Sequence, residues 1–389
     1  MDAVTIEDKQ RPDAVCLDRH FGVIPKAYVS SVGLIPDTRP ATGPRVGFVY
    51  PCWQALGGVE RHTLSLVKTA RGVHWSGLAA LYPDQVNHEA LQALRQFLPT
   101  CERPGLRRLM ELSDILIVWG FVGGVDEWLR DYRGKVICIT HGEGAWSEKQ
   151  LRQTLPYAQT LVSVSESAVS AFPVAVRQRV RVIHNGIEFD RLAVSGDKAT
   201  CQRDLGIEPG AFVVGTIGRL SEEKNPLAAA EAVAEMGGNA VALYVGDNGK
   251  AEFADKFMRD AERIAPGRIV WHRDVNHNAI GDYFRAMDVF LMASPAEGGP
   301  LVSLEAMFAG VPQVATPVGM LPELERRHGP LTWTVPVDPT PEQLAAAIRS
   351  VDASDERVRR ARDVAIDELS AAVCARQWGE LLRDVHAEG

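Results

Sequence analysis

Two glutamates, Glu297 and Glu305, are separated by seven residues within the stretch DVFLMASPAEGGPLVSLEAMFAGVP. The short apolar run Asp288–Ser294 before them predicts a buried strand. Pro295 and the glycines after Glu297 break that strand, and the segment Leu301–Ala309 has a helical pattern that ends at Gly310. The first carboxylate therefore lies in a glycine loop and the second on the helix that follows it.

A strand, a glycine loop and a helix N-terminus together offer free backbone amides and the positive end of a helix dipole to an anion. We expect these amides from Leu301, Val302 and Ser303, after Pro300 at the first helical position. Carboxylates beside them would accept hydrogen bonds from hydroxyl groups. The stretch thus predicts a negative, hydroxyl-rich ligand, and a nucleoside-diphosphate sugar has this chemistry. The alternative is an ordinary strand–loop–helix unit with a solvated Glu297.

Two cations occupy one loop after another predicted strand, Phe212–Ile217. The loop is GRLSEEKNP and contains Gly218, Arg219 and Lys224. Arginine offers a planar fork for phosphate and lysine a compact charge. As an alternative, the two cations would form surface ion pairs with the neighbouring glutamates of the loop.

The first half of the chain repeats the strand and glycine-loop arrangement. The predicted strand Arg45–Tyr50 is followed by Gly57 and Gly58, and the predicted strand Val136–Thr140 leads directly into His141. Open α/β sheets bind ligands at the carboxyl ends of their strands, so these residues are candidates for the same site. The alternatives are close packing for the glycines and a hydrogen bond to loop backbone for the histidine.

The segments EGGPLVSLEAMFAGVP, GRLSEEKNP, GGVERHTLSL and HNGIEFD together resemble the retaining glycosyltransferases of family four, and the resemblance covers about residues 44–389. It implies the GT-B fold, an α/β architecture in which two Rossmann-like domains with parallel sheets face each other across a cleft. It also implies that Glu297 contacts the transferred sugar, that Glu305 contacts the ribose, and that Arg219 and Lys224 bind the diphosphate. His141 would contact the donor sugar or the acceptor.

Two departures from the family pattern stand out. Gly299 and Pro300 replace the commoner Phe-Gly, and Pro300 has no N–H to offer a ligand. The residues Trp271–Val275 replace a glycine turn whose backbone reads the nucleobase in the family, so the sequence leaves the base open.

The length of 389 residues fits two α/β domains. We expect an N-terminal arm with a short strand at Phe21–Ile24, an acceptor-side domain, a nucleotide-sugar domain and a C-terminal helix that crosses back to the first domain. A polar linker, Arg191–Thr200, would join the two domains. The predicted boundaries are 1–43, 44–193, 194–368 and 369–389.

The net charge of −8 argues against a general nucleic-acid binder, because phosphate contacts need a basic face. Six scattered cysteines without zinc spacing, and no apolar signal core, predict a cytoplasmic protein. Peripheral contact with the inner membrane face through Arg103, Arg107 and Arg108 is an alternative to a solvated surface. The sequence assigns no oligomeric state.

The sequence contains no Asp-x-Asp motif, so we expect no metal and no cofactor besides the nucleotide-sugar co-substrate. The acceptor would carry a hydroxyl group, on a glycan, a lipid, a natural product, a protein or a modified nucleic acid. A GT-B sugar-nucleotide epimerase or hydrolase, or a non-catalytic nucleotide-sugar-binding scaffold, are the alternative functions.

Overall fold

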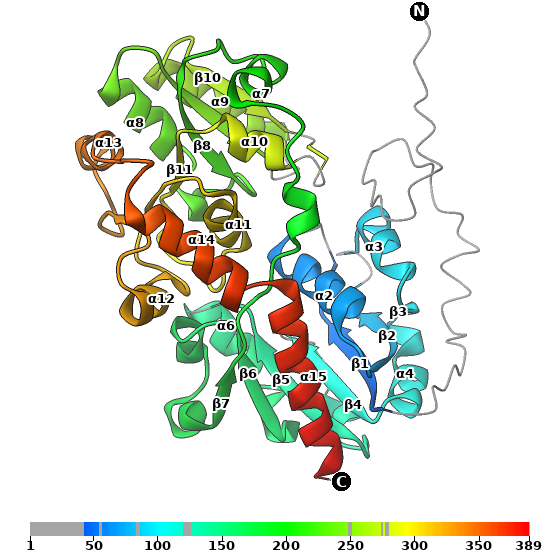
Figure 1. Ribbon diagram of the computed structural model, residues 1–389. Coiled ribbons are helices and arrows are strands. Elements are labelled where there is room, and N and C mark those ends of the chain that lie inside the picture. The colour runs from blue at the N-terminus through cyan, green and yellow to red at the C-terminus, as the bar shows by residue number, and fades with distance from the viewer. Residues whose placement is uncertain are drawn as a thin grey trace, which may run out of the picture.

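A computed structural model describes residues 43–53, 57–82, 86–119, 126–142, 144–247, 251–273, 275–276 and 280–388. The expected strand at Phe21–Ile24 lies outside these residues. The described chain forms two lobes, each built on a parallel sheet, which Figure 1 shows one above the other. The α/β class with two Rossmann-like sheets is therefore confirmed.

The first lobe contains a seven-stranded sheet in the order β3-β2-β1-β4-β5-β6-β7. Its strands are β1 (Arg45–Tyr50), β2 (His74–Ala80), β3 (Thr100–Glu102), β4 (Ile115–Trp119), β5 (Lys135–Thr140), β6 (Thr160–Ser163) and β7 (Val180–Val182). Its helices are α2 (Gly58–Thr69), α3 (His88–Arg95), α4 (Leu106–Leu112), α5 (Asp126–Leu129) and α6 (Gly144–Leu151). The strands β1, β4 and β5 are apolar runs buried on both faces, as expected for a parallel sheet covered by helices.

The second lobe contains a six-stranded sheet in the order β10-β9-β8-β11-β12-β13. Its strands are β8 (Phe212–Ile217), β9 (Ala240–Val245), β10 (Ile269–His272), β11 (Val289–Met292), β12 (Gln313–Ala315) and β13 (Trp333–Thr334). Its helices are α7 (Lys198–Asp204), α8 (Ala228–Met236), α9 (Ala251–Ile264), α10 (Ile280–Ala286), α11 (Leu301–Ala309), α12 (Leu321–His328), α13 (Pro341–Arg349) and α14 (Glu356–Glu368). In each sheet the chain first adds strands on one side of its first strand, β1 or β8, and then crosses to add the remaining strands on the other side. The topological switch points therefore lie between β1 and β4 and between β8 and β11.

The chain passes twice between the lobes, and the two passages pack together. Ile187 donates its amide to Leu369 O at 2.9 Å and accepts from the amide of Ala371 at 2.8 Å. Gly186 is required here, because a Cβ at this position would lie 2.8 Å from Ala371 Cα and 2.7 Å from Cys374 Cβ. The hinge between the lobes is thus a close pair of backbone segments.

The last helix, α15 (Ala371–Ala387), returns to the first lobe and packs on α2 (Figure 1). Ser370 caps it by accepting from the amide of Val373. Trp378 is 1% exposed and joins the apolar core of the first lobe. No helix in the described ranges combines the length and the apolarity that crossing a membrane requires.

The predicted linker Arg191–Thr200 is partly helical, because α7 begins at Lys198. Asp197 caps that helix by accepting from the amide of Thr200 at 2.8 Å. The sequence hides this start, since a short polar segment with a glycine is also typical of a loop.

Candidate functional site

The loop between β11 and α11, which carries Glu297, reaches the first lobe. Asn185 Nδ2 donates to Gly299 O at 2.9 Å. A Cβ added at Gly298 would overlap the carbonyl oxygen of His141 and lie 2.7 Å from its carbonyl carbon. The structure therefore brings the two predicted halves of the site, the Glu297 loop and His141, into direct contact.

Lys224 and Glu297 form an ion pair at the switch point of the second sheet. Lys224 ends a 3-10 turn, Glu222–Lys224, after β8, while Glu297 follows β11. Lys224 Nζ lies 2.6 Å from Glu297 Oε1, with the two side chains 31% and 13% exposed. The cation predicted for the diphosphate and the carboxylate predicted for the sugar thus neutralise each other without ligand.

Arg219 takes the arrangement that the sequence offered as the alternative, an ion pair with Glu223 one helical turn away. The two side chains are 59% and 61% exposed. An exposed pair of this kind stabilises a protein by about 0–1 kcal/mol. Arg219 therefore loses little free energy when it changes partner.

Glu305 is 1% exposed and pairs with two arginines that the sequence did not assign to the site. Arg191 Nη1 bonds to Glu305 Oε1, and Arg61 Nη1 lies 3.6 Å from the same oxygen. Glu305 Oε2 is buried and has no hydrogen-bond partner among the described residues. Arg61 lies in the GGVERH segment that we quoted for its glycines, whereas Arg191 fell in the predicted linker and gave no signal.

His141 presents two unused ring nitrogens. Both are buried and have no hydrogen-bond partner in the described chain, so the expected alternative of a bond to loop backbone is not formed. The rings of His62 and Trp119 pack edge-on at 5.2 and 5.7 Å between centroids. Burial, and then the neighbouring His62, lower the pKa of His141 well below its usual value. The neutral ring offers one donor and one acceptor.

Of the three backbone amides predicted to bind an anion at the N-terminus of α11, one is already hydrogen-bonded within the protein. Ser303 donates its amide to Pro300 O at 3.0 Å and its hydroxyl to Gln313 Oε1 at 2.7 Å, so both of its donors serve the fold. Pro300 is the N-cap of α11 and gives no side-chain cap. The amides of Leu301 and Val302 donate to no described residue, so both remain candidates for contact with an anion.

The glycines leave room beside the same strand ends. Among the described residues, a Cβ at Gly58 would meet no atom within 4 Å, and one at Gly57 would meet only Glu60 Oε2. Gly218 adopts φ +140°, a conformation that favours glycine, and a Cβ there would also point into open space. All three positions therefore let a ligand approach the backbone.

The two lobes also meet through Glu323 on α12. Its Oε1 contacts His184 Nε2 and its Oε2 accepts from the amide of Glu166 at 2.5 Å. Arg326 adds a bond to the carboxylate of Glu166 at 2.7 Å. Both oxygens of this buried carboxylate are used within the protein, whereas Glu305 uses only Oε1 among the described residues.

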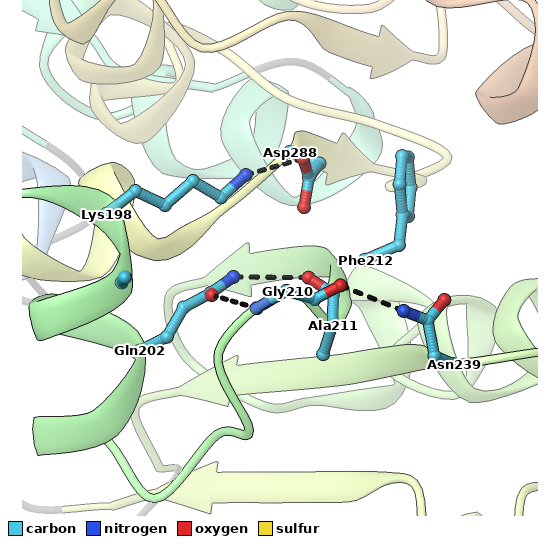
Figure 2. A pocket seen from close by; sticks show the side chains of 8 residues that line it. Lys198, Gln202, Gly210, Ala211, Phe212, Asn239 and Asp288 are labelled. Carbon is cyan, nitrogen blue, oxygen red and sulfur yellow. Dashed lines mark hydrogen bonds and ion pairs between the residues drawn. The ribbon is translucent and has the colours of Figure 1, made fainter.

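A cavity of about 500 Å³ lies at the opposite edge of the second sheet. Figure 2 shows its polar lining paired internally: Lys198 with Asp288 at 2.5 Å, and Gln202 with the backbone of Gly210 and Ala211. Phe212 and Asp288 lie at the amino ends of β8 and β11, whereas parallel sheets bind ligands at the carboxyl ends. We therefore do not assign this cavity as a ligand-binding site.

Two further expectations concern the nucleobase segment Trp271–Val275 and metal binding. Asp274, within the departing segment Trp271–Val275, lies outside the described residues. Among the residues that are described, no three His, Cys, Asp or Glu side chains cluster as metal ligands would.

Comparison with known proteins locates the similarity. Residues 211–352, most of the second lobe, match the family described as "Glycosyl transferases group 1". The chain is 32% identical over 158 residues to the D-inositol 3-phosphate glycosyltransferase of Streptomyces avermitilis, a match that covers 38% of this chain and 34% of the relative. The enzyme of the same name from Segniliparus rotundus is 31% identical over 192 residues, with coverages of 47% and 41%. The matches thus span less than half of each relative.

Solved structures extend the likeness to both lobes. Anabaena HepE in complex with UDP-glucose superposes with a TM-score of 0.74 at 18% identity, covering 88% of this chain and all of HepE. Sucrose-phosphate synthase from Thermosynechococcus elongatus gives 0.65 at 16% identity, covering 89% of this chain and 100% of that one. These similarities and the two parallel sheets establish the GT-B fold.

Proposed function

We propose that this protein is a retaining glycosyltransferase of family four that transfers a hexosyl or related sugar from a nucleoside-diphosphate sugar to a hydroxyl acceptor without a metal. The match of residues 211–352 to a glycosyltransferase family, and the identity of part of the chain to D-inositol 3-phosphate glycosyltransferases, support the class of reaction. The observation that carries the proposal is a set of buried polar atoms without partners in the described chain. Of the buried polar atoms without partners in the described residues, those that lie in the candidate site are the two ring nitrogens of His141, Asn185 Oδ1, Ser221 Oγ and Glu305 Oε2.

These atoms belong to loops or helices that follow the carboxyl ends of strands in the two sheets. Buried polar groups are normally hydrogen-bonded, so atoms without partners at this place need an explanation. A ligand with many hydroxyl groups would satisfy them together. A nucleoside-diphosphate sugar supplies hydroxyl groups on both its ribose and its sugar, and its diphosphate suits the uncapped amides of Leu301 and Val302.

Lys224 links the two charged parts of the reaction. Its ammonium group has three N–H donors, and Glu297 accepts one of them. Lys224 can therefore contact the leaving diphosphate while it still holds Glu297 against the sugar. Arg219, released from its exposed pair with Glu223, would add a second positive charge to the diphosphate.

The remaining roles follow from protonation and position. Neutral His141 can donate to one hydroxyl and accept from another, at the junction of the two lobes. Glu297 is committed to Lys224 on the same lobe, so we do not assign it as a covalent nucleophile. In the reaction that we propose, the bond from the sugar to the phosphate breaks, the acceptor oxygen bonds on the same face, and its proton passes to the leaving phosphate.

The test is a thermal-shift screen with UDP-, GDP- and dTDP-sugars, starting with UDP-glucose because HepE is a structural neighbour that binds it. A donor at a hundred times its dissociation constant should add about 2.7 kcal/mol to the free energy of unfolding. NMR of the product then reports whether the anomeric configuration is retained.

Three outcomes would contradict the proposal. If no donor raises the free energy of unfolding, the residues assigned here do not form a nucleotide-sugar site. Stabilisation without release of nucleoside diphosphate, with acceptors of each class present, would indicate a binding scaffold. An epimerised sugar nucleotide would indicate the GT-B epimerase alternative.

A further inference from the structure

Three charged side chains from three different parts of the chain meet at the junction of the lobes. Glu305 lies on α11 of the second lobe, Arg61 on α2 of the first, and Arg191 in the 3-10 turn Phe189–Leu192 that follows the first passage between them. Their side chains are 1%, 16% and 12% exposed. Charges so deeply buried need partners, because water no longer solvates them.

The three groups are arranged asymmetrically. Both arginines approach Glu305 Oε1, whereas Oε2 is buried without a partner in the described chain. Glu323, a second buried carboxylate at the junction, differs, because His184 and the amide of Glu166 use both of its oxygens. A carboxylate with a purely structural role would be expected to resemble Glu323.

Arg61 keeps its charge at neutral pH. Burial, followed by repulsion from Arg191, lowers the pKa of Arg61 to about 10, and the carboxylate of Glu305 acts in the opposite direction. At pH 7 Arg61 is therefore protonated. Two guanidinium groups against one carboxylate oxygen orient the whole carboxylate, since the two oxygens are rigidly joined.

We infer that Arg61 and Arg191 are positioning residues of the nucleotide site, which hold Glu305 Oε1 so that Oε2 accepts hydrogen bonds from the ribose hydroxyls. This inference rests on the proposed function, in which Glu305 contacts the ribose. It adds that a residue of the first lobe completes a contact made by the second. Recognition of the ribose then depends on the approach of the lobes, because Arg61 reaches Glu305 only across their junction.

The experiment measures ribose selectivity by titration calorimetry. The probes are UDP and 2′,3′-dideoxy-UDP, and likewise GDP and 2′,3′-dideoxy-GDP. A hydrogen bond to a charged group corresponds to a preference of about 10- to 100-fold for the ribose nucleotide in the unmodified protein. Arg61→Met and Arg191→Met should bring this ratio toward one, as Glu305→Gln should.

Two kinds of variant control the result. Arg61→Lys and Arg191→Lys keep a charge without the planar fork and should retain part of the ratio. If a methionine variant fails to fold, the lysine variant at the same position serves as the test. Its affinity ratio between ribose and dideoxy nucleotide should then lie between one and the ratio of the unmodified protein. Arg359→Met removes an arginine that is 69% exposed on α14 and should leave the ratio unchanged.

The outcomes separate the inference from the function on which it rests. Equal loss of affinity for the ribose and dideoxy nucleotides in the arginine variants would reduce Arg61 and Arg191 to structural residues. A ratio lost in Glu305→Gln but kept in all arginine variants would also overturn the inference, yet leave the proposed function standing. If the unmodified protein binds neither UDP nor GDP, the proposed function itself fails.

Discussion

Gly298 offers the sharpest test of the contact between the lobes, because it lies where a side chain has no room. A Cβ at this position would overlap the carbonyl oxygen of His141, and it would lie 2.7 Å from the carbonyl carbon and 2.9 Å from Gly142 Cα. All three atoms belong to backbone and cannot rotate away. Gly298→Ala therefore forces either the Glu297 loop or the whole lobe to move.

The size of the movement follows from ordinary contact distances. Carbon atoms pack at about 3.5–4.0 Å, so relief of the 2.7 Å contact requires a displacement of about 1 Å. A misplacement of about 1 Å in a catalytic site can lower the rate about 100-fold, equivalent to about 2.7 kcal/mol. We expect a loss of this order in donor turnover, while the cores of both lobes, and hence folding, are unaffected.

The assay is release of nucleoside diphosphate from the donor, combined with small-angle X-ray scattering to measure the radius of gyration. Gly298→Ala should lower turnover and increase the radius of gyration. Gly379→Ala is the matched control, because its Cβ would meet only Arg383 Nη1, at 3.4 Å, inside helix α15. It should keep full turnover and raise stability by about 1 kcal/mol. Full turnover and unchanged scattering in Gly298→Ala would refute the contact with His141.

The remaining predictions concern charge, metal and pH. Lys224→Ala and Arg219→Ala should each lower turnover by about two orders of magnitude with little change in unfolding, since each removes a charge at the leaving group; full activity in both would place the diphosphate elsewhere. Glu297→Gln should lower kcat and keep UDP binding, whereas Glu305→Gln should mainly raise the donor KM; loss of UDP binding in Glu297→Gln alone would reverse the two roles. Activity should persist after exhaustive EDTA treatment, and complete loss that Mg²⁺ or Mn²⁺ restores would contradict metal independence. Burial lowers the pKa of His62 to about 4, so as pH falls from 6.5 toward 4 the unfolded state takes up the proton first and the free energy of unfolding decreases by up to about 3 kcal/mol. Urea unfolding at several pH values checks this, and an identical pH dependence in His62→Gln would contradict it.

Segments whose local pattern agrees with their burial could be predicted closely. The strands Arg45–Tyr50 and Phe212–Ile217 and the helix Leu301–Ala309 have the expected bounds, and the strand expected at Val136–Thr140 begins one residue earlier, at Lys135. The apolar pattern of Leu78–Tyr82 predicts a strand there, but β2 spans His74–Ala80. Ser76 and Gly77 interrupt the apolar run there, and the structure accommodates the buried hydroxyl of Ser76 through a bond to Leu112 O at 2.9 Å. That partner is 36 residues away and leaves no local signal.

In the candidate site too, features of one short segment could be predicted, whereas contacts between distant segments could not. Its loops were predicted because a strand end, glycines and charged residues stand together in the sequence, as in GRLSEEKNP. The contacts of Asn185 with Gly299 and of Arg191 with Glu305 each join residues 114 positions apart. The first contact depends on how the lobes approach, and the second on how the turn Phe189–Leu192 packs against α11. Spacing within one loop determines neither of them. The site residues assigned from the sequence remain predictions until they are tested.

The pairing of charges at the site explains how it can be both stable without a ligand and specific for one. Lys224 is paired with Glu297 and Arg219 with Glu223, while Arg61 and Arg191 share the carboxylate of Glu305. In the function that we propose, the diphosphate shares Lys224 with Glu297, and Arg219 exchanges its exposed partner Glu223 for a phosphate. The hydroxyls of the sugar and the ribose donate to Glu297 and to Oε2 of Glu305, while Arg61 and Arg191 stay on Oε1 of Glu305. The whole ligand then leaves no buried charge at the site without a partner, whereas inorganic phosphate supplies no hydroxyl group for Glu305 Oε2.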